Sequence, residues 1–475
     1  MSISADVLRS YRLIDEKTVD ELLAQEIKNN NKKIVVLDDD PTGVQTVHDI
    51  SVYTGWDADS LREAFAEENN LFYILTNSRG FTEEQTKEAH LEIADAVDRA
   101  AKEASRDYIF ISRSDSTLRG HYPLETRLLK ECYERNTGVK LDGEILCPFF
   151  KEGGRYTIGN VHYVKYGDEL VPAHETEFAK DKTFGYTAEN LPDYVEEKTA
   201  GEYKAKDVIS ISLEDIRSMD FDKIKSQLMS AKNFNKIIVN AIDYSDIKVF
   251  AVALFRAMNA GKMFMFRTAA ALVKVMGGVS DMPLLTRSDM IVNETENGGI
   301  IVVGSHTAKT TSQLECLKEI ADIEFIELDA NLVRDEEGFA NEVDRCLALE
   351  GEYIESGKTV CCYTSRSLVV ANTGDKEDEL RLSVRISDAV QSLVGRLPVT
   401  PSFVVAKGGI TSSDVGVKAL KVKRATVLGQ IKPGIPVWQT GSESKFPNTP
   451  YVIFPGNVGE ATTLREAVEE LMNKR

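Results

Sequence analysis

The sequence lacks the features that mark membrane, secreted and nucleic-acid-binding proteins. No run of about 18 apolar residues occurs, so we expect no membrane-spanning helix. Residues 1–10 show no basic region followed by an apolar run, so we expect no signal peptide. Basic side chains are in deficit, because 57 Lys and Arg stand against 76 Asp and Glu, and the net charge is −19. A surface of that charge repels nucleic acid and anionic lipid, so neither is an expected partner.

Cysteine is also scarce, and its placement carries little chemistry. The six cysteines form no C-x-x-C pair of the kind that binds metals. Reduced thiols in a cytoplasmic protein are therefore expected. The remaining composition, 42% hydrophobic and 28% charged, is that of a folded soluble chain. A length of 475 residues exceeds one ordinary core, so we expect two or three domains.

Short apolar runs alternate with amphipathic stretches along the chain. Runs such as 33–37 have strand character, and stretches such as 83–104 have the periodicity of a helix. This alternation predicts an α/β fold with mostly parallel sheets. Residues 156–205 are polar, and only 190–198 looks helical, so we expect a long irregular segment there. Such segments are usually functional or flexible.

The alternation is interrupted once. Residues 281–298 carry proline, glycine and polar side chains without clear periodicity, which indicates a linker. We therefore expect two consecutive α/β domains, at 1–280 and 299–475. The ligand site is expected in the cleft between them.

Three carboxylates directly follow the first buried strand. The strand runs into Asp38-Asp39-Asp40-Pro41-Thr42-Gly43. The carboxyl end of a parallel strand is where α/β folds bind ligands. Clustered carboxylates repel one another, and they are tolerated when they bind a cation, share a proton or accept hydrogen bonds from a polyol. A solvated acidic turn is the plainer alternative.

Three further polar clusters in the first half contain arginine. They are 112–121, which holds the sequence Asp115-Ser116-Thr117-Leu118-Arg119-Gly120, then 76–80 and 153–157. An N-cap with a salt bridge would also explain the first of them. Arginine is the forked donor for carboxylates and phosphates, so their meeting at one sheet edge predicts a small-anion site. The arginines concerned are Arg79, Arg113, Arg119 and Arg155.

The second half contains three strand-to-helix loops with glycine. They begin at Gly304, Gly408 and Gly456. Each alone is ordinary for an α/β fold, but three together favour a nucleotide site, because glycine lets the backbone approach a phosphate closely. Neither a G-x-x-x-x-G-K-[ST] loop nor a G-x-G-x-x-G loop after the first strand is present.

These motifs, in this order, resemble the four-carbon acid sugar kinase family over residues 32–470. The matching segments are Asp39-Asp40-Pro41-Thr42-Gly43, Asp115-Ser116-Thr117-Leu118-Arg119-Gly120, Gly154-Arg155-Tyr156, His174-Glu175-Thr176-Glu177-Phe178-Ala179-Lys180-Asp181, Gly304-Ser305, Gly408-Gly409-Ile410-Thr411 and Gly456-Asn457-Val458-Gly459. Three positions depart from the family pattern: Asp38, Pro41 and His306.

The resemblance implies an N-terminal sugar-acid-binding domain and a C-terminal nucleotide-binding domain. It implies ATP-dependent phosphorylation of the terminal hydroxyl of a tetronate, such as threonate or erythronate, or of a 3-oxo-tetronate, with Mg²⁺ accompanying ATP. We consider a homodimer as the assembly of this protein.

We assign residue roles from this resemblance together with the division of the chain into acids and arginines in the first half and glycine loops in the second. The expected catalytic residues are Asp39, Asp115 and Arg119. The expected substrate-binding residues are Asp38, Asp40, Thr42, Arg79, Arg113, Ser116, Thr117, Gly154 and Arg155. The expected ATP-binding residues are Ser305, Thr307, Gly408, Gly409, Ile410, Thr411, Gly456, Asn457 and Gly459. Arg119 and nearby hydroxyls would hold the substrate carboxylate, and Asp39 or Asp115 would accept the hydroxyl proton.

Two alternatives compete with the kinase. The segment from Asp38 to Thr42 also spells D-x-D-x-T, the nucleophile loop of haloacid-dehalogenase-type phosphatases, with Asp38 as nucleophile and Asp40 as acid. That alternative leaves the Asp115 motif and the glycine loops unexplained. A non-catalytic sensor of a sugar acid or nucleotide is the other alternative, and it would bind ATP without turning over any tetronate.

Overall fold

The chain forms two compact units. The computed structural model describes residues 2–305, 307–366, 376–456 and 458–473. Unit 1 comprises Met1–Gly43 and Gly55–Ser280, and unit 2 comprises Val44–Thr54 and Asp281–Arg475. Directly after the triple-aspartate turn, the chain thus contributes an eleven-residue segment to unit 2 before it returns to unit 1.

Unit 1 is built on a parallel sheet in the order β10-β11-β6-β12-β5-β2-β4. Its strands are β2 (Lys33–Asp38), β4 (Leu71–Leu75), β5 (Tyr108–Arg113), β6 (Gly143–Cys147), β10 (Ile209–Ile211), β11 (Asn235–Val239) and β12 (Phe264–Thr268). The next two strands of this sheet along the chain, β4 and β5, lie on opposite sides of β2. That arrangement makes the carboxyl end of β2 a topological switch point, where such folds bind ligands.

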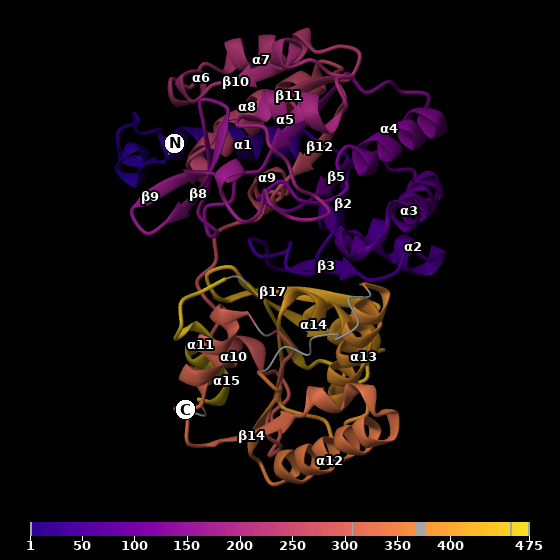
Figure 1. The fold of residues 1–475 in the computed structure, drawn as a ribbon. Coiled ribbons are helices and arrows are strands. Elements are labelled where there is room, and N and C mark those ends of the chain that lie inside the picture. The colour runs from indigo at the N-terminus through magenta and orange to yellow at the C-terminus, as the bar shows by residue number, and fades with distance from the viewer. Residues whose placement is uncertain (1, 306, 367–375, 457, 474–475) are drawn as a thin grey trace. The chain divides into compact units, whose positions relative to one another are not determined.

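Helices cover both faces of this sheet (Figure 1). One layer contains α2 (Ala58–Ala66), α3 (Glu83–Glu103) and α4 (Leu124–Thr137), which pack in series. The other contains α1 (Glu16–Lys28), α6 (Leu213–Arg217), α7 (Phe221–Ser230), α8 (Tyr244–Asn259) and α9 (Ala270–Met276). The helix starts follow their sequence signals: Thr82 and Gln85, for example, form a reciprocal capping box at the start of α3.

The first part of the segment that we expected to be irregular forms a small antiparallel sheet, whereas residues 176–190 contain no helix or strand, as expected. The order of the sheet is β1-β9-β8-β7, with β1 (Ile3–Ser4), β7 (Arg155–Ile158), β8 (Val161–Tyr166) and β9 (Glu169–Pro172). Gly159 and Gly167 take left-handed backbone conformations, with φ of +57° and +56°, in the turns between these strands. The expectation was wrong for these strands, which are only two to six residues long and partly exposed and so lack a continuous apolar run. Helix α5 (Leu191–Lys198) agrees with the sequence.

Unit 2 has a mixed sheet in the order β3-β17-β18-β19-β16-β13-β15-β14. The strands β19 (Pro450–Phe454), β16 (Val404–Lys407), β13 (Ile300–Val303), β15 (Thr359–Thr364) and β14 (Ile323–Leu328) are parallel. The strands β3 (Ile50–Tyr53), β17 (Arg424–Lys432) and β18 (Ile435–Thr440) extend this sheet in antiparallel pairs. The helices are α10 (Arg287–Met290), α11 (Ala308–Leu317), α12 (Glu336–Glu355), α13 (Lys376–Gly395), α14 (Gly409–Asp414) and α15 (Thr463–Met472).

Each unit has its own apolar core. In unit 1 the strand residues Ile34, Val35 and Val36 are fully buried. In unit 2 a cluster that includes Ile301, Val405 and Val452 lies between the sheet and its helices. Among the described residues, no helix combines the length and apolar character needed to cross a membrane. The two-unit α/β fold with mostly parallel sheets confirms the predicted fold class.

Candidate functional site

The triple-aspartate turn lies at the carboxyl end of β2, and two of its three carboxylates are buried. The side chains of Asp38 and Asp39 are 1% and 3% exposed, whereas that of Asp40 is 15% exposed. Asp40 Oδ1 accepts hydrogen bonds from the Thr42 amide at 2.8 Å and from the Thr42 hydroxyl at 2.5 Å, which closes the turn. A Cβ atom added to Gly43 would overlap both Asp38 and Arg113, so only glycine fits there.

Two arginines compensate these carboxylates. The Arg79 guanidinium lies 2.7 Å from Asp39 Oδ1 and 3.3 Å from Asp40 Oδ2. Arg113 pairs with Asp38, lies 3.0 Å from Asp39 Oδ1, and donates to the Asp40 carbonyl at 2.8 Å. The turn is therefore held by buried ion pairs. The sequence predicted that these aspartates and arginines lie in neighbouring loops, but it did not predict which aspartate pairs with which arginine.

The Asp115 motif folds against the same turn. The Asp39 amide donates to the Arg113 carbonyl, and a Cβ added to Gly120 would lie 3.4 Å from Asp39 Oδ2. Asp115 accepts a hydrogen bond from Arg119 Nε at 2.8 Å and another from the Thr117 hydroxyl. Three predicted loops, those after β2, β4 and β5, thus meet at one edge of the sheet.

Asp39 and Asp115 differ in basicity. Burial raises the pKa of Asp39 to about 7. The charge and hydrogen bond of Arg79 act to lower this pKa, whereas the carboxylates of Glu125 and Asp40 act to raise it. Burial also acts to raise the pKa of Asp115, but the charges of Arg79 and Arg119 outweigh it and hold that pKa well below its usual range. Near neutral pH, Asp39 can take up a proton and Asp115 cannot.

A buried layer beneath the turn was missed by the sequence reasoning. Glu125, on α4, accepts a hydrogen bond from the Ser78 hydroxyl at 2.6 Å and lies 3.8 Å from His90 Nε2. Arg267, at the end of β12, lies 3.7 Å from Glu125, and it donates to the Ser114 hydroxyl at 2.8 Å. Arg267 also donates to the Arg119 carbonyl at 3.0 Å. Glu125 and His90 lie within helices, where nothing in the local pattern distinguishes them from surface residues.

Ser116 and Thr117 are held mainly through their backbone. His162 Nε2 lies 2.7 Å from the Ser116 carbonyl, and the Tyr186 hydroxyl donates to the Thr117 carbonyl at 3.1 Å. Burial lowers the pKa of His162 to about 4, so this ring is neutral and donates to Ser116 from Nε2. These contacts come from the small antiparallel sheet and the segment after it, which fixes the Asp115 loop from one side.

Arg155 stands apart from the other arginines of the site because no carboxylate among the described residues pairs with it directly. It lies at the start of β7, after Gly154, whose backbone is left-handed at φ +71°. Its guanidinium donates to the Gly153 carbonyl, but among the described residues it forms no ion pair, and its buried Nε has no hydrogen-bond partner. Burial lowers the pKa of Arg155, and the nearby charge of Asp115 offsets this only in part. An anionic ligand would complete this site.

Most of the predicted nucleotide residues lie at the carboxyl ends of adjacent strands of unit 2. Ser305 follows β13 and Gly408 follows β16. A Cβ atom added to Gly408 would lie 3.3 Å from the Cβ atom of Ser305. A Cβ atom added to Gly456 would lie 4.0 Å from Gly408 Cα. Thr307 caps α11 by accepting a hydrogen bond from the Thr310 amide at 3.3 Å. Gly409 and Thr411 lie in the first turn of α14, and Ile410 there is 74% exposed. Gly459 has φ +83° in the loop after β19, whereas His306 and Asn457 lie outside the described residues.

Lys407 was not among the residues predicted for the nucleotide site, although it directly precedes the two glycines. Its side chain is fully buried at the end of β16, and it forms no ion pair among the described residues. Nζ donates to the Pro455 carbonyl at 2.6 Å and lies 4.3 Å from the Phe454 ring centroid. Burial lowers the pKa of Lys407 to about 7, with a smaller contribution from Lys309. The sequence signal that could have identified Lys407 is a lysine at the end of an apolar strand, directly before a Gly-Gly pair.

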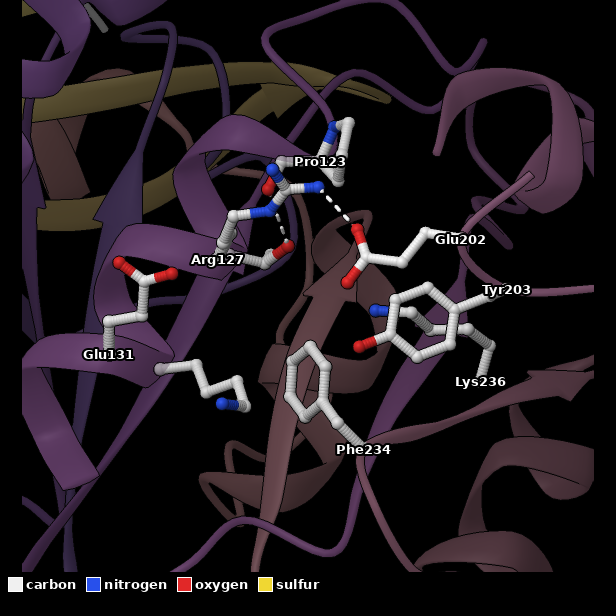
Figure 2. Close-up of a pocket in the computed structure, with 9 residues that line it drawn as sticks. Pro123, Arg127, Glu131, Glu202, Tyr203, Phe234 and Lys236 are labelled. Atoms are coloured by element: carbon white, nitrogen blue, oxygen red, sulfur yellow. Dashed lines mark hydrogen bonds and ion pairs between the residues drawn. The ribbon is translucent and has the colours of Figure 1, made fainter. Parts of the chain in front are cut away.

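A cavity of about 180 Å³ in unit 1 is lined by other residues (Figure 2). Figure 2 shows the Arg127 guanidinium directed at Glu202, and the rings of Tyr203 and Phe234 beside Lys236. Each of its three cations pairs with a carboxylate: Arg127 with Glu202, Lys130 with Glu134, and Lys236 with Glu144. Because these charges are already compensated, the cavity is a poorer anion site than the surroundings of Arg155.

Family models match both halves of the chain. A model described as a sugar-binding N-terminal domain matches residues 34–276, and one described as a nucleotide-binding C-terminal domain matches residues 300–464. The first match contains the aspartate and arginine cluster, and the second contains the glycine loops.

Solved structures share the fold. Protein HI1011 of Haemophilus influenzae, matched by the family model DUF1537, is 19% identical, with a TM-score of 0.59 over 92% of this chain and 100% of its own. A Salmonella typhimurium LT2 protein, named provisionally as a tRNA synthase, is 14% identical, with a TM-score of 0.62 over 92% of this chain and 99% of its own. At these identities the likeness concerns the fold alone. No protein with a curated description matches the chain.

The fold and the two domain models define a two-domain α/β protein that binds a sugar through its N-terminal half and a nucleotide through its C-terminal half. The chain belongs to the four-carbon acid sugar kinase family, which confirms the resemblance seen in the sequence.

Proposed function

We propose that the protein is an ATP-dependent kinase that phosphorylates the terminal hydroxyl of a four-carbon sugar acid, such as a threonate, an erythronate or a 3-oxo-tetronate. The observation that carries the proposal is the pairing of two unusual groups in unit 1. Asp39 is a buried carboxylate with a pKa of about 7, and Arg155 is a half-buried cation with no ion pair among the described residues. A substrate hydroxyl that attacks a phosphate needs a base such as Asp39, and a carboxylate on the same substrate needs a cation such as Arg155.

Asp39 is the general base in this proposal. The hydroxyl oxygen attacks the γ-phosphorus, its proton passes to an Asp39 carboxylate oxygen, and the bond to the β-phosphate oxygen breaks, so that ADP leaves with that electron pair. Asp115 is too weak a base for this role, because Arg119 and Arg79 stabilise its ionised form. Asp115 instead holds Arg119 in place through the 2.8 Å hydrogen bond.

Carboxylate recognition falls to Arg155, with Arg119 as its neighbour. The sequence had suggested Arg119 for this role, but its Nε already donates to Asp115, and its Nη1 lies 3.9 Å from Asp181. Arg155 has no such partner among the described residues. An incoming carboxylate gains most from a guanidinium whose desolvation is not yet compensated.

The nucleotide phosphates are assigned to the glycine loops and Lys407 of unit 2. The amide groups of these loops and the Lys407 ammonium would meet the phosphate charge. Phosphoryl transfer ordinarily uses Mg²⁺ bound to the nucleotide. In the described part of the chain, no group of three His, Cys, Asp or Glu side chains could hold a metal ion, and Asp38, Asp39 and Asp40 are engaged by arginines. We therefore assign no protein ligand to Mg²⁺ and derive no step from it.

The burial and ion pairing of Asp38 argue against the phosphatase alternative. Its side chain is 1% exposed and pairs with Arg113, so it is not presented as a nucleophile. Nothing in the site favours a sensor over an enzyme. All six cysteines are free thiols, which supports a reducing, cytoplasmic setting for the kinase.

The experiment that tests the proposal is an ADP-release screen with four- to six-carbon sugar acids, ATP and Mg²⁺. We expect ADP release with a tetronate or 3-oxo-tetronate, and none above background with the matching polyols, because these lack the carboxylate that Arg155 would bind. If no sugar acid stimulates ADP release from protein that binds ATP, the kinase assignment is wrong.

Replacing Gly408 should weaken nucleotide use alone. Its φ of +122° is strained for any residue with a Cβ, and the added atoms of Gly408→Val would press on Ser305. We expect the KM for ATP to rise about tenfold, corresponding to about 1.4 kcal/mol of lost binding, while the KM for the sugar acid stays the same. Initial rates with each substrate varied separately measure both constants.

Gly357→Val is the matched control. Gly357 follows α12 in the same unit, also has a positive φ, +85°, and would bring its Cβ to 3.0 Å from the Glu296 carbonyl. The control should lose stability by thermal melting while its KM for ATP is unchanged. An unchanged KM in Gly408→Val would remove this loop from the nucleotide site.

A further inference from the structure

Phe178 lies in a hydrogen-bonded turn next to the proposed carboxylate site. The turn follows the short helix η3 (Ala173–Glu175), and it is closed by hydrogen bonds from the Lys180 amide to the Glu177 carbonyl and from the Asp181 amide to the Phe178 carbonyl. The half-buried Phe178 ring packs against an apolar cluster that includes Leu118 and Tyr186. Its position is thus set by the same segment that holds the Asp115 loop.

Two guanidinium groups contact this one ring. The Cζ atom of Arg119 lies 5.1 Å from the Phe178 ring centroid, and that of Arg155 lies 5.4 Å from it. Both distances are within the range of cation–π attraction, which extends to about 6 Å. Arg119 comes from the loop after β5 and Arg155 from β7, so Phe178 is the contact that these two cations share.

An aromatic partner orients a cation without neutralising it. A carboxylate in the same place would compensate the guanidinium and compete with a substrate carboxylate for it. The ring instead attracts both guanidinium groups through its quadrupole, offsets their mutual repulsion, and limits the conformations of two long side chains. Arg119 Nε donates to Asp115 and Arg155 Nη1 to the Gly153 carbonyl, so the nitrogens that these two bonds leave are the donors for an anion.

We propose that Phe178 is a positioning residue of the sugar-acid site: its ring holds Arg119 and Arg155 as a preformed receptor for the substrate carboxylate. The inference rests on the proposed function, since it names how that site recognises its acid. It predicts that Phe178 acts on binding of the acid through the arginines and has no part in nucleotide binding.

Titration calorimetry with D-threonate and D-erythronate tests the proposal without requiring turnover. We expect Phe178→Leu to bind the acid that the wild type binds about tenfold more weakly, and Phe178→Tyr to stay within about threefold of the wild type, because tyrosine keeps the ring. The KM for ATP should be unchanged in both. Phe221→Leu is the matched control: Arg256 lies 5.2 Å from the Phe221 ring on α7, and its loss should leave acid binding unaltered.

A double-mutant cycle separates positioning from general loosening of the fold. In an Arg155→Met background, Phe178→Leu should cost clearly less than in the wild type, because one of its two cations is gone. Equal costs in the two backgrounds, or wild-type acid binding by Phe178→Leu, would overturn the role of Phe178 and leave the proposed kinase intact. Failure of the wild type to bind any sugar acid would overturn both.

Discussion

Asp39→Asn is expected to lower kcat by about 10²- to 10⁴-fold, the usual contribution of a general base. The change keeps the shape of the side chain and removes its basicity. Asp39 is the buried carboxylate whose pKa lies near neutrality, about 7, so it is the group that can accept a hydroxyl proton at working pH. The KM for ATP should change little, because Asp39 belongs to the sugar-binding unit. Steady-state ADP release measures both constants.

The pH profile of kcat provides a second readout of the same residue. Because the base must be ionised, the wild-type rate should fall about tenfold per pH unit below a pKa of about 7, and level off above it. Asp39→Asn should lose this inflection. Asp115→Asn is the matched comparison: it disturbs Arg119 and lowers the rate, but it should keep the inflection, since the pKa of Asp115 lies well below its usual range.

The outcome that would reverse the assignment is equally specific. If Asp115→Asn lost the inflection and Asp39→Asn kept it, Asp115 would be the base. If both variants retained near-normal turnover, neither carboxylate would take the proton.

The sequence located the site loops better than it identified their interactions. The runs after β2, β4 and β5 were visible because polar residues directly follow buried apolar strands, and the parallel-sheet rule places them at one edge. The resemblance then separated a sugar-binding half from a nucleotide-binding half. It did not reveal that Asp38 forms an ion pair with Arg113, or that Arg155 has no ion pair among the described residues. Pairing depends on side-chain directions in space, and a linear pattern does not encode them.

Residues that act through long-range packing were the ones missed. Glu125 and His90 lie inside helices α4 and α3, and Arg267 ends β12, so each meets the site only after the sheet is assembled. The strand β3 belongs to unit 2 for the same reason: its partner β17 lies more than 350 residues later in the chain. Non-local pairing of this kind leaves no local periodicity to detect.

Arg155→Met is expected to raise the KM for the sugar acid by about 10- to 100-fold, as loss of a charge-assisted hydrogen bond of about 1.5–3 kcal/mol implies. The reason is that the guanidinium forms no ion pair among the described residues and its burial is only partly offset by the charge of Asp115, so a substrate carboxylate would be its first direct partner. Methionine keeps much of the apolar stem, which preserves packing. The unfolding temperature should change little, because no ion pair within the described residues is broken. Rates with the acid varied at saturating ATP measure the effect.

Arg127→Met distinguishes this site from the cavity of Figure 2. Arg127 is also an arginine of unit 1, but Glu202 lies 2.8 Å away and already compensates its charge. We expect its replacement to leave the KM for the acid unchanged, since half-exposed ion pairs contribute only about 0–1 kcal/mol and their loss is local. A raised KM in Arg127→Met together with a normal KM in Arg155→Met would place the carboxylate in that cavity. A raised KM in Arg155→Met alone would show that an uncompensated charge, more than the size of a cavity, marks where this protein binds its acid.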